Sequence, residues 1–265
     1  MLTPILSILL PSLLTLTPLV SAHGRIVNIT TSSGNTYSGF DPAVFLKNPS
    51  SPPPLAAWSA DNLGNIFVPP SSFSHSNITC HRAGTPGALH IPTPPGSNLT
   101  LTWNEWPTSH KGPVLTYLAS CNASCTSVSK DALRWVKIDE QGWLNSSGWT
   151  ELGGTWASDV LIKNGFSWTV KVPEELEAGA YVLRHEIIAL HVANETDGAQ
   201  AYPQCVNLMM GNKRIDGGVD ARKFYKENDK GIMVDIHHKL DGYAIPGPKL
   251  WTAAEPVEQP NEAEK

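Results

Sequence analysis

The 265-residue sequence is poor in charged side chains, and in basic ones above all. Charged residues make up 16% of it, against about 25% in an average soluble domain. Lys and Arg number 19 against 24 Asp and Glu, for a net charge of −5. A disordered chain is rich in charge and poor in apolar residues, and a nucleic-acid-binding protein normally has a basic surplus. The composition excludes the first class and argues against the second.

Long apolar runs are absent after the first charged residue, Arg25. Residues 1–22 (MLTPILSILLPSLLTLTPLVSA) contain three prolines, which suit a membrane helix poorly. The run ends in Val-Ser-Ala, the small-residue pattern of a secretory cleavage site, although it lacks the usual basic residue at its start. We therefore expect a signal peptide cleaved after Ala22 and a secreted mature chain with no membrane span.

Cysteine is scarce but even in number, with Cys80, Cys121, Cys125 and Cys205. In an oxidising compartment these four are expected to form two disulfides, for which three pairings exist. Asn-x-Ser/Thr sequons support secretion independently, since they are candidate glycosylation sites of a secreted protein. The sequons begin at Asn28, Asn77, Asn98, Asn122, Asn145 and Asn194.

Convincing amphipathic helices are few, whereas Gly (21) and Pro (22) are plentiful. Short β-rich segments between Gly, Pro and Asn turns predict an all-β fold, a β-sandwich of the immunoglobulin or fibronectin-III kind with long loops. Without a repeat or long linker, residues 23–251 are expected to form one domain, followed by a disordered acidic tail over 252–265. The expected strands are Leu99–Trp103, Val114–Leu118, Trp135–Ile138, Ser167–Val172, Tyr181–Val192 and Cys205–Met210.

One expected strand, 181–192 (YVLRHEIIALHV), carries two histidines. Strand alternation places His185 and His191 on one face and Arg184 and Glu186 on the other, where we expect a structural ion pair. The histidines are separated by roughly 20 Å along a strand. Alternation alone does not decide which of them reaches a functional site.

Cleavage after Ala22 would make His23 the first residue of the mature chain. An N-terminal histidine offers a metal two nitrogen donors, its imidazole and its α-amino group, whose pKa of about 7.7–8.0 allows ready loss of the proton. Such donors suit Cu(II), and a third nitrogen from another histidine would complete a T-shaped site. The plain alternative is that signal peptidase happens to leave a histidine there.

Several motifs follow this start in a fixed order. In this combination the chain resembles the fungal AA9 lytic polysaccharide monooxygenases, formerly glycoside hydrolase family 61, over essentially all of 23–251. The resemblance implies a secreted enzyme with one copper ion, which oxidatively cleaves cellulose or a related β-1,4-glucan at C1, C4 or both. The motifs are His23-Gly24, SHKGPV (109–114), RHEIIALH (184–191), GAQAYPQC (198–205) and IPGP (245–248).

The resemblance assigns the copper ligands. His23 matches the N-terminal ligand that uses both its amine and its imidazole, and His110 in SHKGPV matches the second copper histidine. Tyr202 in GAQAYPQC matches the axial tyrosine, which lies near the metal without being a strong ligand.

Around the metal, the resemblance implies three further roles. Gln200 matches the glutamine that positions oxygen species, and in an extended segment it shares a face with Tyr202. His191 is our preferred match for the histidine near the oxygen species, with His185 as the alternative. Tyr243, in DGYAIPGP, matches a loop position that often stacks on sugar rings, although it could equally be a packed loop tyrosine.

The resemblance also implies the disulfides Cys80–Cys205 and Cys121–Cys125. The expected partners are the polysaccharide and an electron donor such as cellobiose dehydrogenase or a small reductant. We expect a monomer that uses O₂ or H₂O₂ and binds neither nucleic acid nor a membrane.

Two other functions compete with this one. A non-catalytic secreted β-sandwich that binds copper or carbohydrate would not need Gln200 and Tyr202 beside the metal. A glycoside hydrolase needs two facing carboxylates, whereas Asp139-Glu140 and Glu174-Glu175 are pairs in sequence only.

Overall fold

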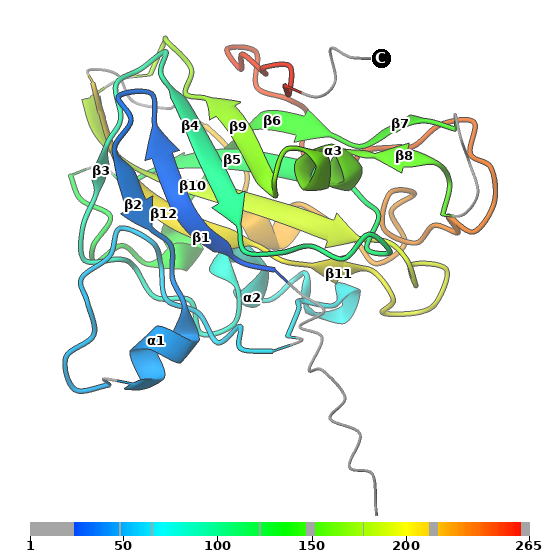
Figure 1. Ribbon diagram of the computed structural model, residues 1–265, viewed down its shortest axis with the longest axis horizontal. Coiled ribbons are helices and arrows are strands. Elements are labelled where there is room, and N and C mark those ends of the chain that lie inside the picture. The colour runs from blue at the N-terminus through cyan, green and yellow to red at the C-terminus, as the bar shows by residue number, and fades with distance from the viewer. Residues whose placement is uncertain are drawn as a thin grey trace, which may run out of the picture.

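The computed structural model describes residues 24–260 except 48, 65, 122, 147–151, 177 and 212–216. Two β-sheets lie one in front of the other, with long loops at their ends (Figure 1). One sheet contains β2 (Thr36–Ser38), β1 (Ile26–Thr31), β4 (Asn98–Trp103) and β9 (Ser167–Lys171), in that order. The other contains β3 (Ile91–Pro92), β12 (Gln204–Gly211), β10 (Ala178–Ala189), β5 (Val114–Ser120) and β6 (Trp135–Gln141), with β11 (Gln200–Ala201) paired to β10. The predicted all-β sandwich is confirmed.

Outside the two sheets, β7 (Trp143–Asn145) and β8 (Thr155–Trp156) form a separate two-stranded ribbon. The described helices are short, as the sequence indicates, and none is long and apolar enough to cross a membrane. They are α1 (Pro42–Lys47), α2 (Asn77–Cys80), α3 (Ala157–Lys163) and the 3₁₀ turns η1 (Pro70–Ser72), η2 (Lys130–Ala132) and η3 (Ala221–Lys223).

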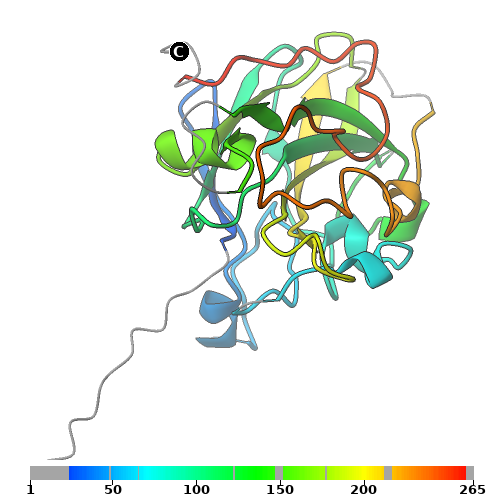
Figure 2. The same cartoon turned by 90° about the vertical axis from the view of Figure 1, so that its right-hand side faces the viewer.

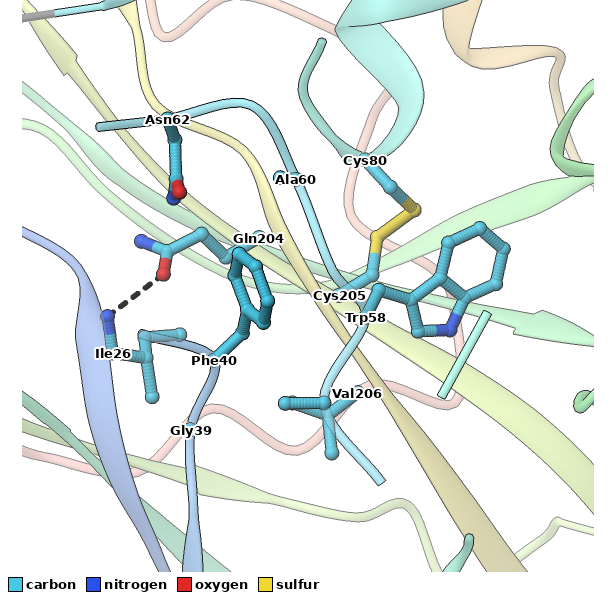
Figure 3. A pocket seen from close by; sticks show the side chains of 11 residues that line it. Ile26, Gly39, Phe40, Trp58, Ala60, Asn62, Cys80, Gln204, Cys205 and Val206 are labelled. Carbon is cyan, nitrogen blue, oxygen red and sulfur yellow. Dashed lines mark hydrogen bonds between the residues drawn. A yellow bond between two sulfur atoms is a disulfide. The ribbon is translucent and has the colours of Figure 1, made fainter. Parts of the chain in front are cut away.

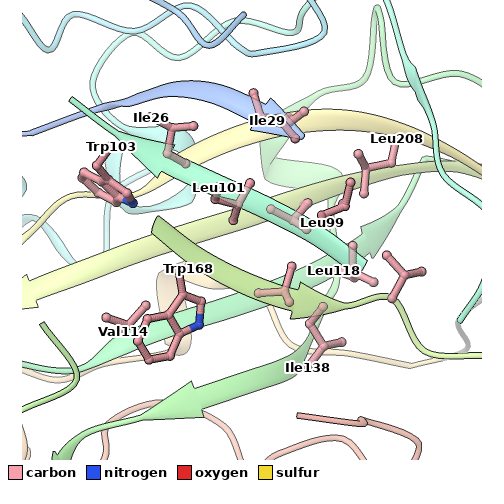
Figure 4. Close-up of a cluster of buried hydrophobic side chains, with 14 of the residues drawn as sticks. Ile26, Ile29, Leu99, Leu101, Trp103, Val114, Leu118, Ile138, Trp168 and Leu208 are labelled. Carbon is pink, nitrogen blue, oxygen red and sulfur yellow. The ribbon is translucent and has the colours of Figure 1, made fainter. Parts of the chain in front are cut away.

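The main core lies between the sheets (Figure 4). Along β4 the side chains alternate between half-exposed and buried, so Leu99, Leu101 and Trp103 point inward. The buried indole of Trp168 on β9 donates a hydrogen bond to Asp139 Oδ2 at 2.7 Å. Asp139 therefore accepts a hydrogen bond in the core between the two sheets. This structural role does not support Asp139 as a catalytic carboxylate of a glycoside hydrolase.

The other face of the β10 sheet buries the ion pair that alternation predicts. Arg184 and Glu186 have no exposed side-chain surface, and the guanidinium donates to both carboxylate oxygens, at 2.5 and 2.8 Å. Arg184 also donates to main-chain carbonyls of α2 and lies over the rings of Tyr117 and Phe224. Burial opposes the charge on Arg184, but Glu186, together with Tyr225 and Tyr117, holds its pKa above the ordinary value. The expected structural ion pair is confirmed.

Strand β10 ends at Ala189, short of the end expected at Val192. The next amide, Leu190 N, donates to the Lys111 carbonyl at 2.8 Å instead of continuing the sheet, and residues 191–194 turn away. His191 therefore leaves the sheet, and the prediction that it shares a strand face with His185 is wrong.

Both disulfides implied by the family resemblance are present. Cys80 at the end of α2 is joined to Cys205 on β12, across a sequence separation of 125 residues. Cys121 and Cys125 close a short loop after β5. The first bond ties distant segments together, so it contributes more stability by loop entropy than the second.

The end of the described chain, 252–260, packs along β9 and is not disordered as expected. Gln259 is 1% exposed, and its amide accepts from Thr169 N at 3.0 Å and donates to Thr169 O at 2.8 Å. Glu255 forms an ion pair with Lys171. The red end of the chain runs over the outside of the sandwich in Figure 2. The last five residues of the predicted tail lie outside the described part.

The predicted sequons are spread over the surface. Their occupancy by glycans stays a prediction. Asn28, Asn98 and Asn194 are exposed, Asn77 and Asn145 are half-buried, and Asn122 lies outside the described residues.

Candidate metal centre

His110 lies in the loop between β4 and β5, and the main chain around it is tightly held. The Trp106 indole donates to the His110 carbonyl at 2.8 Å. Gly112 packs against β10 so closely that a Cβ there would come within 1.8 Å of the Ile188 carbonyl oxygen. The Gly112 amide also donates to Ser158 Oγ at 3.1 Å. His110, which is 8% exposed as a residue, is thus held in a rigid loop.

The His191 ring stacks directly on the His110 ring. The ring centroids lie 3.9 Å apart with 29° between the planes. The turn after β10 makes this possible because it carries His191 out of the sheet. His185 stays inside the sandwich, where its Nδ1 is 2.9 Å from Thr116 Oγ1 and its ring lies 5.8 Å from Trp103. Of the two candidate histidines, His191 is the one that contacts His110.

Gln200 and Tyr202 form a hydrogen-bonded pair on one face of an extended segment. The Tyr202 hydroxyl donates to Gln200 Oε1 at 2.7 Å, and the two residues are 2% and 9% exposed. Gln200 is paired with Ala189, the last residue of β10, so this pair lies close to the start of the His191 turn. Burial raises the pKa of the Tyr202 phenol above its ordinary value, so the phenol is neutral near neutral pH.

Trp106 connects the histidine pair to the Gln200–Tyr202 pair. Its ring meets Tyr202 edge-on with the centroids 5.1 Å apart, and its centroid lies 5.9 Å from that of His110. The sequence motifs assign no role to Trp106. Its place four residues before His110 in WPTSH was the available signal.

His23, the predicted N-terminal ligand, lies outside the described residues. The described chain begins at Gly24, which lines a small cavity together with Tyr202. A Cβ on Gly24 would come within 1.9 Å of the Glu105 carbonyl oxygen and 3.1 Å of the Trp103 ring. Only glycine fits between these groups, so the first described residue is held beside the tyrosine of the site.

Tyr243, the predicted sugar-binding residue, is half-buried. Its hydroxyl donates to the Gly231 carbonyl at 2.7 Å, and its ring meets Trp156 edge-on at 4.8 Å. The loop that carries it contacts the His191 turn, since Val234 N donates to Ala193 O at 2.9 Å. Its role in sugar binding stays a prediction.

Two buried histidines outside this cluster are expected to make the fold sensitive to acid. Burial lowers the pKa of His185 to about 3 and that of His81 to about 4, from an ordinary 6.5. Below pH 6.5 the two histidines are therefore protonated in the unfolded chain but not in the folded one. The free energy of unfolding is then highest above pH 6.5 and falls as the pH drops towards the pKa values of the folded protein. For His185 alone, the loss from pH 7 to pH 4 is on the order of 3 kcal/mol.

Guanidinium unfolding at a series of pH values between 4 and 7 measures this effect. His185→Gln is expected to be less stable at pH 7 but to take up about one proton fewer on unfolding in acid. Parallel stability curves for the variant and the wild type would contradict the assignment.

The family comparison decides the identity of this constellation. The model of Auxiliary Activity family 9 (formerly GH61) matches residues 23–243. The chain belongs to the AA9 family. The family resemblance seen in the motifs is thereby confirmed.

Curated AA9 relatives are similar over most of the chain. AA9 family lytic polysaccharide monooxygenase F of Malbranchea cinnamomea is 46% identical over 243 residues, which is 91% of this chain and 96% of that protein. AA9 family lytic polysaccharide monooxygenase I of Emericella nidulans is also 46% identical, over 236 residues and 88% of this chain. The alignment covers 64% of that protein, so this chain spans just under two thirds of its length.

Solved AA9 structures share the fold. The extended catalytic domain of H. jecorina LPMO9A superposes with a TM-score of 0.81 at 39% identity, covering 88% of this chain and 92% of that one. Cel61B of Hypocrea jecorina, described as a glycoside hydrolase family 61 member, gives 0.79 at 37% identity and covers 86% of this chain and 100% of that one.

Proposed function

We propose that this chain is a secreted, copper-dependent lytic polysaccharide monooxygenase that cleaves cellulose or a related β-1,4-glucan at C1, C4 or both. It would use O₂ or H₂O₂ and an external electron donor. The observation that carries the proposal is the convergence of His110, His191, Gln200 and Tyr202 around Trp106. A sandwich that only binds carbohydrate has no need for this arrangement.

The donors at the site suit copper. His110 would supply one imidazole, His23 its amine and imidazole, and the neutral Tyr202 phenol would lie beside the metal; such nitrogen donors favour Cu(II). Coordination of His110 through Nε2 leaves the 3.1 Å contact between its Nδ1 and Ser109 Oγ intact. Within the described part of the chain, no group of three or more His, Cys, Asp or Glu side chains could hold a metal. In the proposed site, the other nitrogen donors come from His23.

The position of Gly24 supports this use of His23. Consecutive Cα atoms are about 3.8 Å apart, and Gly24 already lines the same cavity as Tyr202. Removal of residues 1–22 would convert the peptide nitrogen of His23 into a free amine that can bind a metal. The proposal therefore depends on correct processing of the leader.

Each residue of the cluster has a separate task. A copper ion held by His23 and His110 would supply the activation of the oxygen species and the abstraction of hydrogen from a glucosyl carbon. Gln200 accepts the hydrogen bond of Tyr202 through Oε1. Its side-chain NH₂ group would therefore be the donor to an oxygen species. His191 can donate or accept a proton beside His110. Tyr202 stays neutral and therefore does not compete as an anionic ligand.

An N-terminal ligand places the metal at the surface, where it can meet a crystalline polysaccharide that no cleft could admit. Tyr243 is our candidate for stacking on a sugar ring next to this point. Of the formal net charge of −5, the acidic end of the sequence after Trp251 contributes a large part. The remaining domain is close to neutral, as suits contact with an uncharged polymer.

Product analysis tests the proposal. The mature protein loaded with copper is incubated with phosphoric-acid-swollen cellulose and ascorbate, and we expect aldonic acids, 4-keto sugars or both. The matched control carries one extra alanine before His23; it keeps every imidazole but lacks the histidine amine, and it should release almost no oxidised product. Copper binding without oxidised products from cellulose, xyloglucan and xylan would favour the non-catalytic alternative.

A further inference from the structure

The side chain of Gln204 connects the two sheets beside the candidate site. Gln204, at the start of β12 in one sheet, accepts a 2.7 Å hydrogen bond through Oε1 from the amide of Ile26, the first residue of β1 in the other. Figure 3 shows this bond crossing from the strand of Gln204 to that of Ile26. It joins the segment that follows Tyr202 to the segment that follows residue 23.

The Ile26 amide depends on this partner. The pairing of β1 with β4 changes register between Ile26 and Asn28, so the regular ladder is interrupted at the start of β1. Ile26 itself is 2% exposed, so water does not readily replace a lost partner. A buried main-chain donor without an acceptor is strongly unfavourable, and the Gln204 side chain supplies the acceptor.

Gln204 is rigidly connected to Tyr202. Side chains two residues apart in an extended segment share a face, which puts Gln204 on the side of Tyr202. The backbone between them is held, because Tyr202 N donates to Ile187 O at 3.0 Å and Cys205 is bonded to Cys80. A displacement of the Gln204 side chain relative to Tyr202 is therefore resisted by both a strand pairing and a disulfide.

We propose that Gln204 is a positioning residue that sets the start of β1, and with it the N-terminal ligand His23, at a fixed place relative to Tyr202. The inference rests on the proposed function only for its consequence on copper. The structural part of the inference is that Gln204 orders the segment beginning at Gly24. This part applies equally to the protein without metal.

A second hydrogen-bonded partner of this segment acts from the other side. Asn104 Oδ1 accepts from Arg25 N at 2.7 Å, and Asn104 N donates to Arg25 O at 2.9 Å. The bonds of Asn104 tie the segment to the loop after β4. The bond of Gln204 ties the same segment to β12, the strand that follows Tyr202. Loss of Gln204 should therefore shift the segment relative to Tyr202 without detaching it.

The test compares Gln204→Leu with Gln204→Glu, which keeps the acceptor, and with the matched control Gln259→Leu. Gln259 also accepts a hydrogen bond from a main-chain amide, that of Thr169. Thr169 lies on β9, at the edge of the four-stranded sheet. In the metal-free protein, Gln204→Leu should speed hydrogen exchange at the Ile26 amide, while the other two variants leave it near the wild-type rate.

With copper, Gln204→Leu should lose about 10–100-fold in affinity by calorimetry, the usual loss when a group supporting a ligand is removed, and should change the Cu(II) EPR spectrum. Gln204→Glu should restore both. Exchange, affinity and spectrum in Gln204→Leu equal to those of Gln259→Leu would overturn the proposal. A wild type that binds no copper would instead refute the proposed function, and the exchange measurement would still decide the structural half. Gln204→Ala serves if the leucine variant does not fold.

Discussion

Replacing His110 with alanine is expected to abolish tight copper binding by the mature protein. In the proposed site, His110 would supply the ligand imidazole that comes from the described chain, and the ring stacked on it, His191, is held by a different loop. We expect a fall of more than about 100-fold, since residues that only support a ligand typically account for 10–100-fold. Isothermal titration with Cu(II) at neutral pH measures it.

The fold should survive this change, because the loop is held through its main chain and through Trp106 and Gly112. An unchanged melting temperature of the metal-free variant checks this. His75→Ala, at an exposed position, is the control and should bind copper as the wild type does. Sub-micromolar affinity retained by His110→Ala would contradict the site assignment.

Replacing Arg184 with methionine is expected to destabilise the protein by about 3–5 kcal/mol, which for a domain of this size lowers the melting temperature by about 6–20 °C. The variant leaves the Glu186 carboxylate fully buried and without the guanidinium, while the Tyr225 hydroxyl still donates a hydrogen bond to it. It also removes the cation that lies over the Tyr117 and Phe224 rings. Denaturant unfolding with the disulfides intact measures the loss.

The double variant Arg184→Met/Glu186→Leu separates the two contributions. It removes both charges, so much of the lost stability should return even though the ion pair is gone. If the double variant were as unstable as the single one, packing around the guanidinium would matter more than the unpaired carboxylate.

Local patterns were sufficient to predict six of the twelve described strands, because strand propensity and alternation are properties of adjacent residues. The strands that the sequence analysis did not predict include β1 at the start of the described chain and the short strands β2, β3, β7, β8 and β11. The expected strand Leu99–Trp103 is β4, and its alternation turns Leu99, Leu101 and Trp103 inward. The end of β10 could not be predicted in this way. Leu190 leaves the sheet because the Lys111 carbonyl, nearly eighty residues earlier, takes its amide.

The sequence predicts those site residues that stand in motifs. It does not predict residues that join the site only through tertiary contacts. His110, Gln200 and Tyr202 stand in recognisable motifs, whereas Trp106 acquires its place only when the His110 loop meets the Tyr202 segment. The bond from Gln204 to Ile26 joins two sheets, and no sequence pattern reports it. Composition likewise suggested a disordered end, because it cannot show that Glu255 and Gln259 have partners on β9.

The docked C-terminal segment has a further consequence for the protein in solution. An unpaired edge strand is a template on which other chains can add strands and aggregate. Gln259 occupies both the N–H and the C=O of Thr169 on the edge strand β9, much as a neighbouring strand would. The other described edges are short, two residues in β3 and three in β2, or flanked by loops, as β6 is by Val219 and Leu250. The docked segment thus shields part of the β9 edge from pairing with a strand of another chain.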